Sequence, residues 1–204
     1  MYDFQKGDLF DIVISELKDH EGLDFLTEYN EKTGELGYWS TATVKELKLS
    51  IFNQAHLRLS GSFHKFFNAG DHNHNDFTIS NFLEVLSELS LEYKLNPFKS
   101  TIHNLEFGVN ITLPFSCEKF LSTIVSYKNL LFDRKTYGGE GYLMKYKLQQ
   151  YELKIYDKGK QFGLNENVLR IEIKVTRMEY LKARGINVSN YADLLSPVNI
   201  QKLS

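Results

Sequence analysis

Hydrophobic and polar residues alternate with a period of two in four parts of the chain, and this pattern predicts β-strands. The alternation runs through residues 56–67, 104–113, 141–157 and 168–176. In the third part, Gln149 and Gln150 interrupt the pattern, which indicates an antiparallel hairpin of two strands. Because side chains on a strand point alternately to the two sides of a sheet, each segment has one apolar and one polar face.

Apolar residues recur at helical spacing between these strands. In residues 81–95 the positions i, i+3, i+4 and i+7 are apolar, and Asn96-Pro97 ends the pattern. Shorter helices are expected over 116–128, where Ser116 is a suitable N-cap, over 177–185, which ends at Gly185, and over 189–195. Together with the strands, these helices predict an α+β fold with a largely antiparallel central sheet and helices packed on one face.

The whole chain, residues 1–204, is expected to form one domain. It is 42% hydrophobic and shows neither an internal repeat nor a linker-like tract. Residues 1–50 are the hardest part to interpret, with a helix expected around 9–17 and one or two strands near 37–49. The chain has no apolar run long enough for a membrane span and no secretory pattern at its start, so a cytoplasmic protein is expected. The single cysteine, Cys117, fits a reducing compartment.

Charge is distributed unevenly, although the net charge is only −2. Residues 1–50 contain 5 basic and 11 acidic residues, whereas residues 127–204 contain 14 basic and 8 acidic residues. Such asymmetry indicates a basic part that faces a polyanion, but an ordinary solvated surface has the same appearance.

The polar faces of three predicted strands carry residues that together suit phosphodiester chemistry. These residues are Glu106 on the first strand, Lys154, Tyr156 and Lys158 on the second, and Arg170, Glu172 and Lys174 on the third. A tyrosine hydroxyl becomes a useful nucleophile only when its proton is removed or its anion is stabilised, and a nearby cation such as Lys158 favours the anion. A divalent ion held by Glu106 and a histidine would polarise a phosphate. Alternating charges also occur on any half-exposed sheet, so that alternative stays open.

Three histidines are candidate metal ligands. His72 and His74 stand two positions apart, and imidazole suits a divalent transition metal. Gly70-Asp71 and the surrounding asparagines indicate a loop, however, where a solvated histidine pair is commoner than a ligand pair. His64 lies on the predicted strand 56–67 and so would point at a fixed site.

Four segments in a fixed order resemble a known family. They read GSFHKFFNAGDHNHNDFTISNFLEVL, NLEFGVNI, YELKIYDKGKQ and LRIEIKVTRMEYLKARGI. The chain resembles the rolling-circle replication initiators of the filamentous-phage gene II/X type, and resembles still more the phage- and plasmid-like replication proteins of Bacteroidetes mobile elements. The likeness extends from residue 57 to the last residue.

The resemblance implies a fold similar to the His-hydrophobic-His endonuclease domain and an enzyme that initiates DNA replication. Such an enzyme nicks one strand at a rolling-circle origin through a covalent phosphotyrosine intermediate, with Mg²⁺ or Mn²⁺ assisting. The residues that match the family's pattern are Tyr156, Lys158, Arg170 and Glu172, with Glu106 at its acidic position. We expect catalytic roles for Tyr156 and Lys158, metal binding by Glu106, Glu172, His64, His72 and His74, and DNA binding by Lys154, Lys160, Arg170, Lys174 and Arg177. The implied partners are single-stranded or origin DNA, with a host helicase and polymerase.

Departures from the family pattern keep alternatives open. Asn73 stands where the related superfamily has a hydrophobic residue between two histidines, and Tyr180 is a rival nucleophile. Members of the family continue beyond the point where this chain ends, which leaves open whether it is a fragment or a short form. Two other functions compete: a non-enzymatic or truncated DNA-binding replication factor, and a small domain that binds single-stranded nucleic acid through its exposed sheet and aromatic residues.

Overall fold

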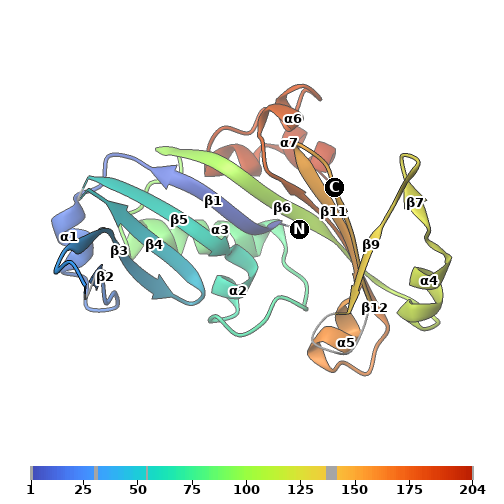
Figure 1. Ribbon diagram of the computed structural model, residues 1–204. Coiled ribbons are helices and arrows are strands. Elements are labelled where there is room, and N and C mark those ends of the chain that lie inside the picture. Colours follow the sequence, from blue (N-terminus) through green and yellow to red (C-terminus); the bar gives the residue numbers. More distant parts are fainter. Residues whose placement is uncertain (1, 30–31, 54, 137–141, 204) are drawn as a thin grey trace.

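One antiparallel sheet of ten strands dominates the computed structural model, which describes residues 2–29, 32–53, 55–136 and 142–203 (Figure 1). The strands lie in the order β2-β3-β4-β5-β1-β6-β12-β11-β10-β9. Their bounds are β1 Tyr2–Leu9, β2 Leu26–Tyr29, β3 Leu36–Val44, β4 Leu47–Phe52, β5 His56–Ser62, β6 Ser100–Thr112, β9 Asp133–Thr136, β10 Tyr142–Lys147, β11 Tyr151–Asp157 and β12 Val168–Val175. A separate pair consists of β7 Ser126–Tyr127 and β8 Leu130–Leu131.

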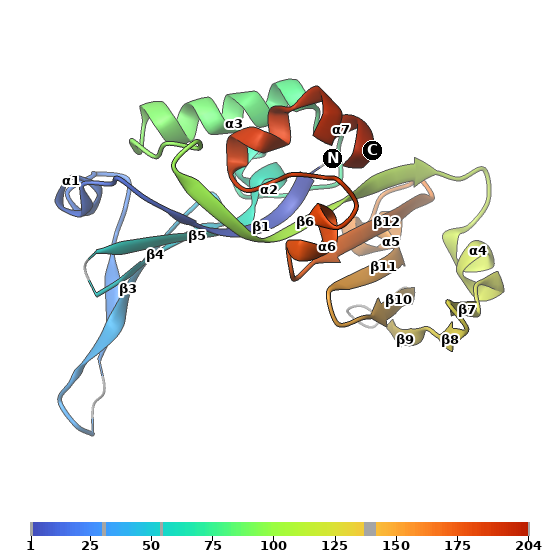
Figure 2. The same cartoon turned by 90° about the horizontal axis from the view of Figure 1, so that it is seen from above.

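The helices are short apart from α3, Ile79–Leu91. The others are α1 Ile14–Lys18, α2 Phe63–Phe67, α4 Cys117–Thr123, α5 Lys158–Phe162, α6 Glu179–Lys182, α7 Pro197–Leu203 and the 3-10 helix η1 Tyr191–Leu195. In Figure 2, α3 and α7 lie together on one side of the sheet. These elements confirm the predicted α+β class with a mostly antiparallel sheet and helices on one face. No helix in the described part of the chain has the length and apolar character needed to cross a membrane.

The core lies between the sheet and the helices. Leu49, Ile51 and Leu59 point from neighbouring strands to the same side and are buried against Phe82 and Leu89 of α3. A second cluster joins Ile155 and Leu169 of the sheet to Leu121 of α4. The residues that alternate with these, among them Lys154, Tyr156 and Glu172, lie on the opposite side, which we call the open face.

Two predicted strands end earlier than their alternation suggests. The strand predicted over 56–67 ends at Ser62, because the Ser62 side chain accepts a hydrogen bond from the Lys65 backbone N–H and starts α2. His64 is therefore on a helix and not on a strand. In the same way, Asp157 accepts a hydrogen bond from the Lys160 N–H and starts α5, so Lys158 does not continue the strand of Tyr156.

Other expectations are confirmed with different bounds. The hairpin is present, with β10 paired to β11 around Gln149 and Gln150. Ser116 caps α4, but that helix ends at Thr123 instead of 128. The helix expected around 9–17 is the shorter α1, the strands near 37–49 are β3 and β4, and the segment 189–195 forms only the single 3-10 helix η1. Strand β1, which lies between β5 and β6, was not predicted.

Candidate active site

Four adjacent strands, β1, β6, β12 and β11, place polar side chains at one position on the open face. The antiparallel register sets Glu172 opposite both Gly108 and Lys154. It also sets Lys174 opposite Glu106, and Arg170 opposite Tyr156. The strand faces deduced from alternation therefore meet across the sheet, and Glu106, Tyr156 and Glu172 line one cavity of about 680 Å³.

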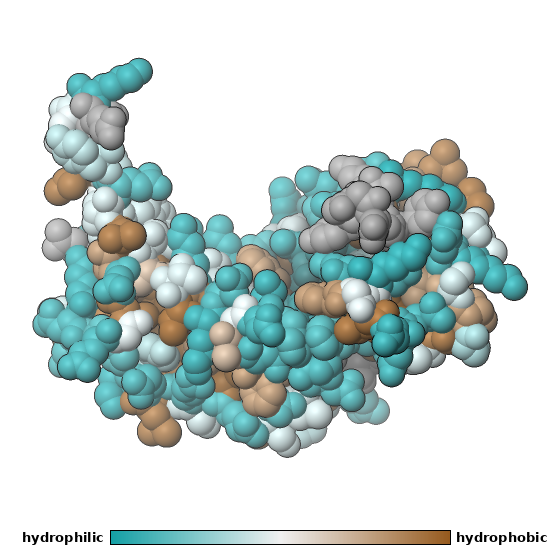
Figure 3. All heavy atoms as spheres, turned by 90° about the horizontal axis from the view of Figure 1, so that it is seen from below, coloured by the Kyte–Doolittle hydropathy of each residue, from teal (hydrophilic) through white to brown (hydrophobic). Residues whose placement is uncertain are grey.

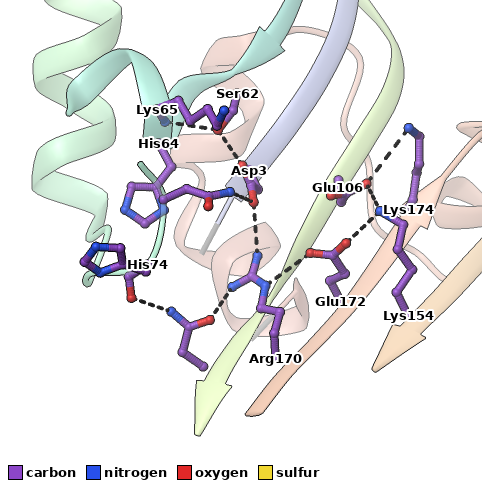
Figure 4. A network of polar contacts seen from close by, with 12 residues as sticks. Asp3, Ser62, His64, Lys65, His74, Glu106, Lys154, Arg170, Glu172 and Lys174 are labelled. Atoms are coloured by element: carbon purple, nitrogen blue, oxygen red, sulfur yellow. Dashed lines mark hydrogen bonds and ion pairs between the residues drawn. The ribbon is translucent and has the colours of Figure 1, made fainter. Parts of the chain in front are cut away.

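Three carboxylates form the centre of this site: Asp3, Glu106 and Glu172. One oxygen atom of each lies within 4.8 Å of the others, and all three residues are buried. The Lys154 Nζ atom lies between two of them, 2.9 Å from Glu106 Oε2 and 2.6 Å from Glu172 Oε1 (Figure 4). On the other side, Arg170 Nε is 3.2 Å from Glu172 Oε2, and Arg170 Nη2 is 3.6 Å from Asp3 Oδ2.

The two glutamates differ in their affinity for a proton. Burial and the neighbouring charge of Glu172 raise the pKa of Glu106 to about 7. Burial alone would also raise the pKa of Glu172, but the cations Lys154 and Arg170 outweigh it and lower that pKa. Glu172 thus stays ionised, whereas the pKa of Glu106 lies close to neutral pH, so Glu106 exchanges its proton in that range.

Three clustered carboxylates fit a hard divalent cation. Mg²⁺ and Mn²⁺ prefer oxygen ligands, and a divalent charge would relieve the repulsion that holds a proton on Glu106. The residues that would hold such an ion are Asp3, Glu106 and Glu172. In the structure Lys154 supplies the compensating charge, so an ion would compete with this ammonium group.

Tyr156 is half-buried and lines the cavity, with its hydroxyl donating a hydrogen bond of 3.3 Å to Glu172 Oε2. Burial and the nearby carboxylates, Glu172 first among them, raise its pKa, whereas Arg170 opposes this effect. The phenol is therefore protonated in the free protein, and its proton already points at a carboxylate.

Lys158 lies fully buried at the start of α5. Its Nζ atom has no hydrogen-bond partner among the described residues and faces the ring of Phe162 at 5.9 Å. Burial, and then the charge of Arg170, lower its pKa to about 8. A buried amine that is easily deprotonated and still has donors to offer suits an anion or a proton transfer at this place.

The three histidines are not in the carboxylate cluster found in the described residues. His64 is buried on α2, with Nε2 2.7 Å from Asn75 Oδ1 and its ring stacked on Phe77. His72 and His74 stack on each other at 3.9 Å, and His74 touches the edge of Phe162. Figure 4 shows His64 and His74 across the network from Glu106 and Lys154. Metal binding by these histidines stays a prediction.

The residues expected to bind DNA fall into three groups. Lys154 and Lys174 are half-buried at the site, where Lys174 lies over the ring of Phe4. Lys160 and Arg177 are exposed. Arg170 is fully buried and contacts carboxylates, so the direct DNA contact expected of it is not supported. Its guanidinium instead holds Asp3 and Glu172 in place.

Asp3 is the residue that sequence reasoning missed. Strand β1 has a register irregularity against β6 between Tyr2 and Gln5, so its side chains do not follow a regular alternation. Ser62 donates a short hydrogen bond to the Asp3 carboxylate, and Asn73 Nδ2 donates another of 2.7 Å. The Ser62 and Asn73 contacts fix Asp3 from segments far away in sequence.

We expect Gly108→Ala to disrupt the site by separating β6 from β12. A Cβ atom at residue 108 would lie 2.1 Å from the Ile171 carbonyl oxygen and 2.7 Å from Glu172 Cα. Overpacking of this kind costs about 1–3 kcal/mol of unfolding free energy, measurable by urea denaturation. Gly22→Ala is the control, because among the described residues the atoms nearest its added Cβ belong to the His20 side chain, at 3.2 and 3.3 Å. Equal stability of the two variants would contradict the close strand contact.

His64 is expected to make stability depend on pH. Burial lowers its pKa to about 4, from 6.5 in an unfolded chain, so the folded protein holds the neutral ring. Below pH 6.5 the His64 ring of the unfolded chain binds a proton that the folded protein does not bind. The unfolding free energy therefore falls by up to about 3 kcal/mol as pH drops to 4. Urea denaturation between pH 6.5 and 4 should show this decrease in unfolding free energy in the wild type and a smaller decrease in His64→Gln. If the unfolding free energies of the two proteins fall equally with pH, folding does not lower the pKa of His64.

Comparisons with known proteins bear on the fold. No family model matches the chain, and no curated protein matches it in sequence. Among solved structures, the rolling circle replication initiator protein from Geobacillus stearothermophilus matches with a TM-score of 0.51 and 14% sequence identity. The match covers 100% of this chain and 79% of that one. The likeness shows the fold.

Proposed function

We propose that this protein initiates rolling-circle DNA replication by nicking one strand at an origin, with Tyr156 as the nucleophile. The observation that carries the proposal is the meeting of Tyr156 with three carboxylates on the open face. The fold shared with a rolling circle replication initiator protein supports it. In the reaction, the Tyr156 oxygen bonds to phosphorus, the phosphorus–oxygen bond to the neighbouring sugar breaks, and that sugar oxygen leaves with a proton as a free hydroxyl.

Asp3, Glu106 and Glu172 are the proposed ligands of Mg²⁺ or Mn²⁺. When bound, the ion would polarise the phosphate and offset the negative charge that develops on it. The chain's own residues do the rest. Glu172 accepts the Tyr156 hydrogen bond and so orients the phenol, while Arg170 keeps that carboxylate ionised and fixed.

Lys158 is proposed to act on the phosphate or on the phenol proton. Its Nζ atom is buried at the start of α5 without a hydrogen-bond partner among the described residues, and the charges of Arg170, Asp3 and Glu172 act on it. Its lowered pKa lets the neutral amine accept a proton near pH 8. With a DNA phosphate beside it, the added negative charge would favour the ammonium form, which stabilises the phosphate instead.

The direct test is capture of a covalent adduct. The full chain is incubated with Mn²⁺ and a pool of random single-stranded oligonucleotides, and DNA that stays attached to denatured protein is sequenced. We expect adducts with a common sequence at the cut. Absence of adducts with every member of the pool would remove the proposal.

A second candidate is a non-enzymatic DNA-binding replication factor. The ion network favours it in one respect, since Lys154 and Arg170 already neutralise Glu172 without an added ion. Such a protein would bind DNA with strong salt dependence, without a need for metal and without cleavage. For either of these two functions, a host helicase and polymerase remain proposed partners.

A further inference from the structure

The open face ends in an exposed aromatic patch, at the opposite end of the sheet from Tyr156. Trp39 of β3 and Phe52 of β4 are directly opposite each other, with ring centroids 4.8 Å apart. Both rings lie on the sheet face, and Trp39 is 37% exposed. Their side of the sheet is the one that α3 leaves uncovered, because the alternating residues Leu49 and Ile51 are the ones packed in the core.

One cation lies beside this patch, and others follow toward the candidate site. The Arg58 guanidinium lies 5.7 Å from the Trp39 ring and is held there by Asp8, whose Oδ1 is 2.7 Å from Arg58 Nε. In the next row across the sheet, exposed Lys48 and half-buried Lys6 both pair with Ser60. Lys174 and Lys154 then follow at the carboxylate cluster.

The hollow shape of the open face connects the two ends. Figure 3 shows a mostly hydrophilic depression, with the projecting β2–β3 hairpin on one side of it. The sheet order puts five strand spacings between β4 and β11. At about 4.8 Å per spacing, this is about 24 Å across the strands. The register adds about ten residues, or about 33 Å, along the strands, because the row of Phe52 passes beyond Ser100 of β6 whereas the row of Tyr156 passes through Asn110. The distance is several nucleotides of an extended single strand.

We propose that Trp39 and Phe52 form a stacking site for unpaired bases of the single-stranded DNA whose phosphate reaches Tyr156. Partly exposed aromatic rings beside a row of cations are the elements of single-strand binding, in which rings stack on bases and cations follow the phosphates. A duplex has its base faces covered, so the patch selects a single strand. The inference rests on the proposed function for the identity of the ligand as DNA.

Trp39 is the only tryptophan in the chain, so its fluorescence reports on this patch alone. The full chain is titrated in EDTA with oligothymidylate of about 16 nucleotides, the upper range for one binding domain. We expect quenching of Trp39 in step with binding measured by anisotropy of a labelled oligonucleotide. An abasic strand of the same length carries the same phosphates without bases, and we expect it to bind more weakly without quenching.

Variants test the same point by affinity. Phe52→Ala should weaken oligothymidylate binding by about 5- to 150-fold, the range for one lost stacking contact, and Trp39→Phe should bind nearly as wild type. Tyr29→Ala is the matched control, because Tyr29 is an exposed aromatic residue of the same hairpin that pairs with Leu36, away from Trp39. It should leave binding unchanged.

Several outcomes would overturn the inference: binding without quenching, equal quenching by the abasic strand, or no binding at all. Quenching by a lysine-rich peptide in place of DNA would make the patch a protein-docking site and would also overturn it. The proposed function fails separately. Quenching without covalent adducts in Mn²⁺ would leave the stacking site in place and remove the nicking activity. Adducts without quenching would support the nicking activity and remove the stacking site.

Discussion

Tyr156→Phe is expected to abolish covalent attachment to DNA and to lower strand cleavage by at least about 10³-fold, because the variant lacks the attacking oxygen. The fold should persist. Only the hydroxyl is lost, and with it one hydrogen bond of 3.3 Å to Glu172, a change of about 1 kcal/mol in unfolding free energy. The measurement is the yield of protein–DNA adduct on a denaturing gel, together with a urea denaturation curve.

Tyr180→Phe is the matched control for this experiment. Tyr180 also follows a strand of the basic C-terminal part, but its ring packs against Tyr151 at 4.4 Å and under Arg184 at 3.6 Å. We expect that variant to form adducts as wild type does. Adducts that persist in Tyr156→Phe and vanish in Tyr180→Phe would move the nucleophile to α6 and refute the site described above.

Glu172→Gln is expected to have the second largest effect, since Glu172 contacts both the phenol and the cations of the site. Loss of one carboxylate from the cluster should weaken Mn²⁺ binding by about 10-fold or more and reduce Mn²⁺-dependent cleavage at least as much. Stability should also fall by about 3–5 kcal/mol, because buried Arg170 loses a charged partner. Calorimetric titration with Mn²⁺ measures the first effect, and denaturation the second.

Glu152→Gln separates metal binding from loss of an ion pair. Glu152 is also buried, lies on the same face of β11 as Lys154, and pairs with Lys145 at 2.8 Å, but it is outside the carboxylate cluster. This variant should be destabilised and yet bind Mn²⁺ normally. If both variants bind Mn²⁺ as tightly as wild type, the cluster is not the metal site.

Period-two alternation predicted the sheet well where strands are long and half-buried. It placed the hairpin β10–β11 and the shared side of Glu106, Tyr156 and Glu172, because these depend only on local spacing and antiparallel pairing. It failed where a capping side chain ends a strand. Ser62 and Asp157 each cap the start of a short helix. The alternation does not predict where such a helix begins, because apolar residues continue through it.

The third carboxylate was beyond sequence reasoning for a different reason. Asp3 enters the site only because β1 inserts between β5 and β6, and such pairing between residues a hundred positions apart leaves no local pattern. Lys158 shows the same limit. Its buried place beside Arg170 follows from how α5 packs on β12, not from its distance to Tyr156 along the chain.

The central position of β1 has a consequence for biosynthesis. A ribosome makes β1 before both of its neighbours, β5, which ends at Ser62, and β6, which ends at Thr112. Until β5 is made, the backbone hydrogen-bonding groups of β1 have no partner strand, and until β6 is made they have a partner strand on one side only. Closing such long loops is slow, so we expect folding to be limited by this late pairing and to be sensitive to chaperones that shield β1.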